Sequence, residues 1–183
     1  MRTLLPDLMK KQPGDTIIMG EHPALGELEW TVLDLKDDRM LLLSRFVLEA
    51  DRFSLNSNHW ESSQLYKKLN REWLTEWFDW IEVGLIFDDS DPLTLLSTEE
   101  VRRYFPEPGS AAAPLLEVEG GQREYTDWSW WLRSPGFGEE FTAYVTASGH
   151  VNEFGVDCTC DEIGVRPAFW LDLSRLPYCH REV

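Results

Sequence analysis

The stretch WSWWLRSPGFG, residues 128–138, places three tryptophans within four residues and then brings an arginine, a proline and two glycines. Side chains alternate along a β-strand, so Trp128 and Trp130 would share one side, in the main core. Trp131 and Arg133 would then lie on the other side. Both sides are too apolar to face water, which predicts a central strand of the fold, covered on both faces.

Two strand patterns precede this stretch. PGDTIIMG is typical of a turn followed by a short strand at 16–19. ELEWTVLDLKDDRMLLLSR predicts a hairpin, because Leu28, Trp30 and Val32 alternate along its first arm. Residues 36–39 would form its turn, and MLLLS would be its short, buried second arm.

The middle of the chain predicts a helix. Leucine or tryptophan recurs every four residues, at Leu65, Leu69, Trp73 and Trp77. This spacing is typical of the apolar face of an amphipathic helix. The segment would form one helix, or two helices joined near Asn70. Three N-cap candidates leave its start open by about a turn, at Asn58, Ser62 and Ser63.

The second half of the chain returns to strands after a short helix. DPLTLLSTEEVRRYF predicts a buried strand that runs into a helix, because Ser97 and Glu100 have capping-box spacing. Residues 106–127, rich in proline, glycine, alanine and serine, predict a long loop. FTAYVTASGHVNEF predicts a hairpin that turns at 148–149, and GVRPAFWLDL predicts one further strand.

This order of elements predicts an α+β fold of antiparallel strands with one or two helices packed on them. No alternation of strands and helices points to a parallel sheet. The chain has 183 residues, of which 43% are hydrophobic. That is enough to bury a sizeable core, and the length fits a single domain over residues 1–183.

The balance of charge argues against a nucleic-acid partner. The formal net charge is −16, which repels a phosphate backbone and removes the attraction on which non-specific nucleic-acid binding depends. The chain contains no apolar run long enough for a membrane helix, and its first residues lack the apolar core of a signal peptide. We therefore expect a cytoplasmic protein without membrane insertion, although a secreted chain that has lost its leader would have the same sequence.

Two arginines in apolar strand segments are the candidate ligand contacts. Trp131 and Arg133 either belong to the core or line a cleft, where an indole face and a guanidinium could hold a flat or anionic ligand. Arg166 would share its strand face with Ala168 and Trp170. It needs a carboxylate or carbonyl partner, because burying an unpaired charge is costly; a structural ion pair and a ligand contact are both open. The candidate ligand-binding residues are Trp131, Arg133, Ser134, Asn152 and Arg166.

The sequence predicts no catalytic residue, metal or cofactor. Cys158 and Cys160 are the candidate metal pair, but zinc sites favour a wider spacing between paired cysteines, and no second pair is present. The third cysteine makes an odd number, which favours a reducing compartment. The four histidines are scattered and no serine or cysteine lies in a nucleophile-elbow motif, which argues against hydrolase chemistry.

The chain resembles a bacterial domain family of unknown function that is marked by a tryptophan-rich WWLRSPG strand and a closing GVRPAxWL segment. The resemblance rests on PGDTIIMG, LEWTVLD with MLLLSR, SSQLYKKLN, LLSTEEVRRYF, WWLRSPG, AYVTASGHVNEFG and GVRPAFWLDL, in this order. It covers nearly the whole chain. Two segments depart from the family pattern, residues 73–91 and the stretch 106–127.

The resemblance implies a C-type-lectin-like fold of the kind shared with formylglycine-generating enzymes and with variable receptor-binding proteins of phage. In that group the scaffold mostly presents a binding surface, so we expect a non-enzymatic module that binds a protein, peptide or carbohydrate. One alternative is a metal-dependent oxidase-like enzyme using Cys158 and Cys160, whose spacing is shorter than that of the formylglycine-generating motif. The iron-dependent sulfoxide-forming branch would need a histidine-rich site that the chain lacks. The other alternative is a structural domain that associates with itself.

Overall fold

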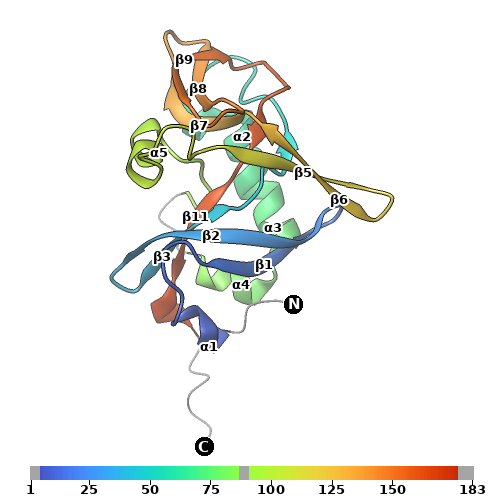
Figure 1. The fold of residues 1–183 in the computed structure, drawn as a ribbon, viewed down its shortest axis with the longest axis vertical. Coiled ribbons are helices and arrows are strands. Elements are labelled where there is room, and N and C mark those ends of the chain that lie inside the picture. Colours follow the sequence, from blue (N-terminus) through green and yellow to red (C-terminus); the bar gives the residue numbers. More distant parts are fainter. Residues whose placement is uncertain (1–4, 87–90, 177–183) are drawn as a thin grey trace, which may run out of the picture.

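The computed structural model describes residues 5–86 and 91–176. It consists of two sheets, a two-stranded hairpin and a set of short helices (Figure 1). The first sheet is antiparallel and has the order β1-β2-β3-β11. Its strands are β1 (Thr16–His22), β2 (Gly26–Lys36), β3 (Arg39–Ser44) and β11 (Ala168–Asp172). The predicted hairpin at 28–44 is confirmed, and Leu28, Trp30 and Val32 are all buried.

The second sheet has the order β4-β10-β7-β8-β9. In this sheet β10 runs parallel to β7, and the other pairs are antiparallel. Its strands are β4 (Glu49–Ala50), β7 (Trp130–Pro135), β8 (Phe141–Val145), β9 (Val151–Asp157) and β10 (Gly164–Val165). The predicted turn at 148–149 joins β8 to β9. With mostly antiparallel strands and short helices, the fold class is α+β, as predicted.

The helices lie mainly between residues 60 and 104. They are α1 (Leu5–Leu8), α2 (Gln64–Lys68), a π-helical segment (Leu69–Trp73), α3 (Leu74–Trp77), α4 (Trp80–Leu85) and α5 (Thr98–Tyr104), with 3-10 turns at Trp60–Ser62 and Leu173–Arg175. Ser63 is the N-cap of α2, because its side chain accepts the Tyr66 N–H. The break between helices falls at Phe78, where Asp79 caps α4, and not near Asn70. None of the helices in the described ranges could cross a membrane.

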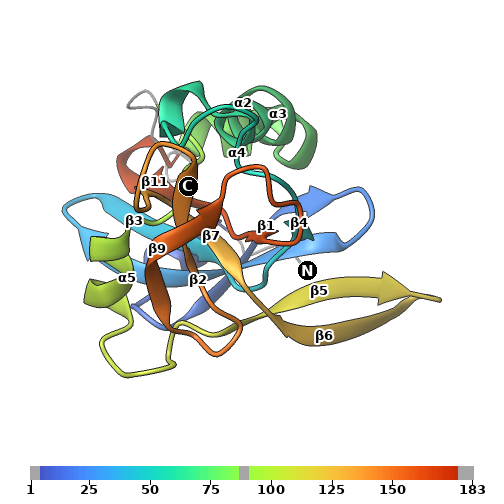
Figure 2. The same ribbon diagram turned by 90° about the horizontal axis from the view of Figure 1, so that it is seen from above.

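Two hydrophobic cores lie on opposite sides of β7. The larger core fills the space between the first sheet and α2 to α4, which form a separate layer in Figure 2. Trp131 belongs to this core, whereas Trp130 and Leu132 belong to the smaller core with α5, β5 and β8. The prediction of a central strand covered on both faces is therefore confirmed. It was wrong for Trp128, which lies at the end of a hairpin strand and is only half-buried.

Residues 106–127 do not form the predicted long loop, because most of them belong to the hairpin of β5 (Ala113–Glu119) and β6 (Gln122–Trp128). Gly120 and Gly121 turn it, with φ values of 58° and 82°. Such paired positive φ angles are what a tight two-residue turn requires. The hairpin forms an arm that extends away from the rest of the molecule (Figure 2). The glycine pair between two short alternating segments was the signal for it.

Two expected strands also differ. GVRPAFWLDL is split into β10 and β11, which belong to different sheets. Between them Pro167 has no N–H to donate to a sheet, so the chain leaves one sheet and enters the other there. The buried segment 92–96 forms one bridge, between Thr94 and Ala168. The Asn70 side chain binds both the N–H and the carbonyl of Leu93, at 2.8 and 2.9 Å, and so replaces a neighbouring strand.

Candidate functional site

Trp131 does not line an open cleft. Its side chain is 0% exposed, its Nε1 donates to the carbonyl of Asp51 at 2.7 Å, and its ring meets that of Phe53 edge-on. An indole whose N–H already has a partner and whose faces are covered is a core residue. Of the two alternatives for Trp131, the structure therefore supports the core.

Arg166 is also in the interior, with 5% of its surface exposed. Its Nε donates to the carbonyl of Ser44 at 2.8 Å, and its guanidinium carbon lies 4.9 Å from the ring centroid of Trp130. Among the described residues no carboxylate pairs with it, so of the two expected partners it has the carbonyl and not the carboxylate, and its Nη1 has no hydrogen-bond partner there. Burial lowers the pKa of Arg166 to about 9, which leaves it charged at neutral pH. A carbonyl and an aromatic face stabilise the cation instead of an acid.

Asn152 stabilises a bend within β9. Its Oδ1 accepts the N–H of Gly155 at 3.1 Å, and its Nδ2 donates to the Tyr144 hydroxyl at 3.3 Å. Gly155 has a φ of 84°, so the amide supports a backbone conformation that few other residues would adopt. Both ends of the Asn152 amide are therefore engaged within the β8–β9 hairpin.

Arg133 and Ser134 are the two candidates that the structure brings together, at the start of α5. Ser134 Oγ accepts the N–H of Thr98 at 3.0 Å. Arg133 Nη1 donates to the carbonyl of Leu95 and to Oε2 of Glu100, the latter at 2.6 Å. The predicted capping box is confirmed, since the side chain and backbone of Ser97 and Glu100 bind each other in both directions. The other three candidates lie elsewhere, so the five residues do not form one cleft.

Arg133 also faces a hollow of about 320 Å³ on the surface. The hollow lies between β3, β11, β7 and the start of α5. Its polar walls and aromatic side come from residues far apart in the chain: Arg39, Asp91, Thr94, Glu100, Arg133 and Trp170. This size is at the lower end of the range of ligand pockets, roughly 300–1,000 Å³.

A second hollow of about 460 Å³ shares Arg39 and Trp170 with the first. The remainder of its lining comes from the β2–β3 turn and the end of β11, namely Lys36, Asp37, Asp38, Asp172 and Ser174. Trp170 is half-buried and lines both hollows. We call the two hollows together the Trp170 groove.

Hydrogen bonds decide the charge of Glu100 at the groove wall. Burial acts to raise its pKa, but the hydrogen bonds from Arg133 and Ser97 outweigh burial and lower the pKa below the usual value. Glu100 is therefore ionised at neutral pH and occupies Nη1 of Arg133. Within the described ranges, Nε and Nη2 of Arg133 and the Nε1 of Trp170 make no hydrogen bond. The groove thus offers a guanidinium edge, an indole and carboxylate oxygens to a ligand.

The sequence pattern located only part of this site. The alternation in GVRPAFWLDL placed Trp170 on the same strand face as the candidate Arg166. That alternation was the available signal for Trp170. Arg39 was predicted only as a turn residue, and Glu100 only as a helix cap. Nothing local in the sequence indicates that these side chains share a hollow with Arg133, because the hollow forms where β11 meets β3 and the segment before α5.

Cys158 and Cys160 do not form part of a metal centre in the described ranges. Cys158 is buried and Cys160 is half-buried. In the described part of the chain no group of three histidine, cysteine or acidic side chains could hold a metal ion. Burial, with the nearby charge of Asp157, raises the pKa of the Cys158 thiol. A thiol of raised pKa is a weak nucleophile and a weak metal ligand at neutral pH.

Comparison with known proteins adds a family match over part of the chain. Residues 88–173 match the family model described as Domain of unknown function (DUF6273). This range is slightly less than half of the chain. It contains Arg133 and Trp170 but not Arg39, and the family description names no activity. No curated protein and no solved structure matches the chain.

Proposed function

We propose that this protein is a non-enzymatic binding module that holds a neutral, hydroxyl-rich ligand, such as a saccharide, in the Trp170 groove. The observation that carries the proposal is that one open hollow is lined both by the half-buried Trp170 and by Arg133, whose Nε and Nη2 make no hydrogen bond within the described ranges. A flat aromatic ring packs against the C–H face of a sugar ring. A guanidinium edge and carboxylates bind pairs of hydroxyl groups.

The charge of the chain favours a neutral ligand over an anionic one. The net charge is −16, and the groove adds Asp91, Asp172 and Glu100 beside its basic residues. A free anion would be repelled on approach. Hydroxyl groups avoid this cost, because they both donate to carboxylates and accept from guanidinium N–H groups.

We further propose that the scaffold is C-type-lectin-like and distantly related to formylglycine-generating enzymes. Two mostly antiparallel sheets, short helices and a hollow lined by strand ends and connections support this proposal. The same arrangement holds Arg133 and Trp170 on strands, which restricts their movement. A site on rigid elements keeps its geometry without a ligand.

Binding to a panel of neutral mono- and oligosaccharides, measured by saturation-transfer NMR and then titration calorimetry, tests the function. We expect Trp170→Ala to weaken binding of a sugar hit at least about tenfold, or roughly 1.4 kcal/mol. Trp80→Ala is the matched control, because Trp80 is 83% exposed on α4 and lies outside the groove. Unchanged binding by Trp170→Ala, or no sugar bound by the wild type, contradicts the proposal.

A further inference from the structure

Three phenylalanines are exposed close to the connection between β7 and β8: Phe137 lies in the connection, Phe141 begins β8 and Phe154 lies within β9. Phe137 is 78% exposed, Phe154 is 77% exposed and Phe141 is 39% exposed. The ring centroids of Phe137 and Phe154 are 6.3 Å apart. We call these three residues the aromatic tip. A single exposed apolar residue is common, but a cluster of exposed aromatic rings is typical of an interaction site.

Backbone hydrogen bonds hold the aromatic tip in place. The N–H of Phe137 donates to the carbonyl of Phe154 at 2.8 Å, and the N–H of Gly136 donates to the carbonyl of Phe141 at 2.7 Å. These bonds join Phe137 to β9 and Gly136 to the first residue of β8. The two most exposed rings therefore stand on adjacent, paired backbone segments.

A side chain from a distant part of the sequence locks the same loop. Asn58 is buried, and its Nδ2 donates to the carbonyls of Gly138 and Phe141, each at 2.8 Å. Gly136 allows the connection after β7 to approach β9 closely, since a Cβ at this position would lie 2.6 Å from the carbonyl oxygen of Phe154. A surface that is already ordered loses little conformational entropy when a partner binds.

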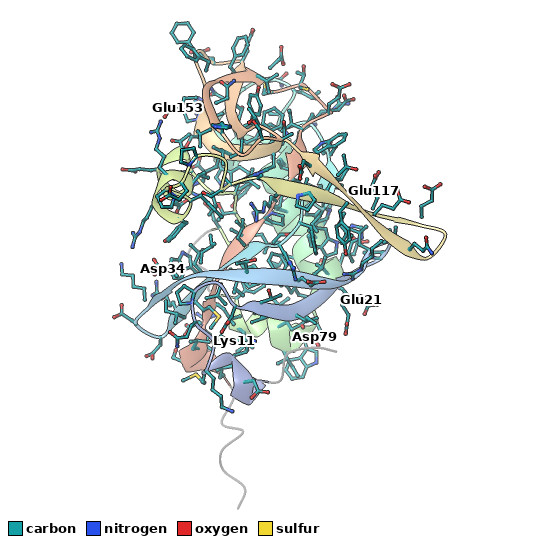
Figure 3. The ribbon with its side chains drawn as sticks, viewed as in Figure 1. Lys11, Glu21, Asp34, Asp79, Glu117 and Glu153 are labelled. Carbon is teal, nitrogen blue, oxygen red and sulfur yellow. The ribbon has the colours of Figure 1, made fainter. Side chains whose placement is uncertain are left out.

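The part of the sequence that carries the aromatic tip is acidic. No lysine or arginine occurs from residue 134 to residue 165. Six acidic residues of this range are exposed, namely Glu139, Glu140, Glu153, Asp157, Asp161 and Glu162. Arg102 of α5 pairs with Glu153 at 2.7 Å, and no ion pair forms with the other five in the described part of the chain. Figure 3 shows Glu153 at the end of the molecule that carries β8 and β9.

We propose that the aromatic tip is a docking surface for a segment of another protein that carries lysines or arginines among apolar side chains. The apolar side chains would cover Phe137 and Phe154. The cations would pair with Glu139 and Glu140, which lie between Phe137 and Phe141 in the sequence. Aromatic anchors with a charged rim are the usual composition of such interfaces.

The same charges argue against other occupants. A second copy docked through the same surface would bring two acidic rims together, because a two-fold interface places the same patch of the two copies face to face. An anionic membrane would be repelled in the same way. The proposal does not rest on the Trp170 groove, because the aromatic tip shares no residue with it.

Selection from a display library of random 12-residue peptides tests the proposal. The wild-type protein serves as bait, and the Phe137→Ser/Phe154→Ser variant serves for counter-selection. Both rings are exposed, so the variant should fold, which circular dichroism and thermal unfolding check. We expect the enriched peptides to combine lysine or arginine with leucine or aromatic residues.

Calorimetry on a synthetic peptide from the selection separates the two contributions. We expect the double phenylalanine variant to bind at least about tenfold more weakly than the wild type. Glu139→Gln/Glu140→Gln should weaken binding at low salt and flatten its salt dependence. The matched control is Trp80→Ser, which removes an exposed aromatic ring from α4. Its neighbour Asp79 lies at the opposite end of the molecule (Figure 3), and binding should be unchanged.

Four results would overturn the proposal. The first would be that no selected peptide discriminates between the wild type and the double variant, and the second that the enriched peptides are acidic or lack charge. The third would be a dimer in sedimentation equilibrium that the double variant abolishes, which would assign the surface to self-association. The fourth would be binding of the wild type to phosphatidylcholine vesicles through the two phenylalanines, which would assign the surface to a membrane.

Discussion

Arg133 Nη1 and Glu100 Oε2 lie 2.6 Å apart, and the same carboxylate oxygen accepts the N–H of Ser97 at 2.7 Å. One acid therefore caps α5 and fixes the guanidinium that lines the Trp170 groove. Because Arg133 also binds the carbonyl of Leu95, the strand β7, the segment before α5 and the helix start are joined at one point. The geometry of the groove depends on the same hydrogen bonds that begin the helix.

Glu100→Gln should lower the free energy of unfolding at pH 7. The amide keeps the size of the side chain but loses the charge that binds Arg133. We expect a loss of about 1 kcal/mol, since the pair is partly exposed and solvent weakens it. Urea denaturation of both proteins at pH 7 measures it. Glu99→Gln, one residue earlier in α5, is the control and should change stability far less.

The same pair predicts a pH dependence. The pKa of Glu100 is lower in the folded state than in the unfolded state. Its contribution is therefore complete above the unfolded pKa, near 4.5, and is lost as the pH falls through the folded value. The stability difference between wild type and Glu100→Gln should shrink between pH 6 and pH 3. A difference that stays constant over this range would show that the carboxylate charge is not the cause.

Arg166→Met and Arg166→Ala should differ in cost. Methionine fills much of the space of the arginine stem and removes a buried charge that has no acidic partner, but it leaves the carbonyl of Ser44 without its donor. We expect a loss of about 1–2 kcal/mol. Alanine also opens a cavity beside Trp130, so its loss should be about 3–5 kcal/mol. Equal losses of unfolding free energy for the two variants in urea denaturation would mean that the contact between the Arg166 cation and Trp130 contributes most of the stability, and not the volume of the side chain.

Gly149 and Gly121 form a matched pair for testing close packing in the β8–β9 turn. Their φ angles are 80° and 82°, so alanine is strained equally at both. A Cβ at Gly149 would lie 2.2 Å from the carbonyl oxygen of Gly109, whereas a Cβ at Gly121 meets nothing within 4 Å. We expect Gly121→Ala to cost about 1 kcal/mol and Gly149→Ala at least about 3 kcal/mol in thermal or urea unfolding. Similar costs would show that the turn moves freely away from Gly109.

Cys158 should react slowly with iodoacetamide in the native protein. It is buried, and burial raises the pKa of its thiol, whereas Cys160 is half-buried. Mass spectrometry of peptides from protein labelled at pH 7.5 should show Cys160 modified before Cys158, and equal labelling in urea. Fast labelling of Cys158 in the native state would instead indicate an activated thiol, as the oxidase-like alternative requires.

Short-range patterns in the sequence determined much of this fold. Alternation at Leu28, Trp30 and Val32 identified the first hairpin, because the two faces of a strand differ in burial. The spacing of Ser97 and Glu100 identified the start of α5, since a capping box is a local hydrogen-bond pattern. Both features depend on residues a few positions apart, so they could be recognised without the rest of the chain.

Only the tertiary structure decided which segments meet. Alternation correctly put Trp130 and Trp131 on opposite sides of a strand, and both side chains lie in core, so of this strand it is Arg133 that lines the open hollow. Arg133 shares a hollow with Arg39 and Trp170 because the chain passes from the second sheet to the first at Pro167, where β11 begins and pairs with β3. Such contacts depend on strand order and on long-range packing. Local periodicity carries no information about strand order or long-range packing. For this reason Arg133 could be selected as a candidate from the sequence, but the residues that surround it could not.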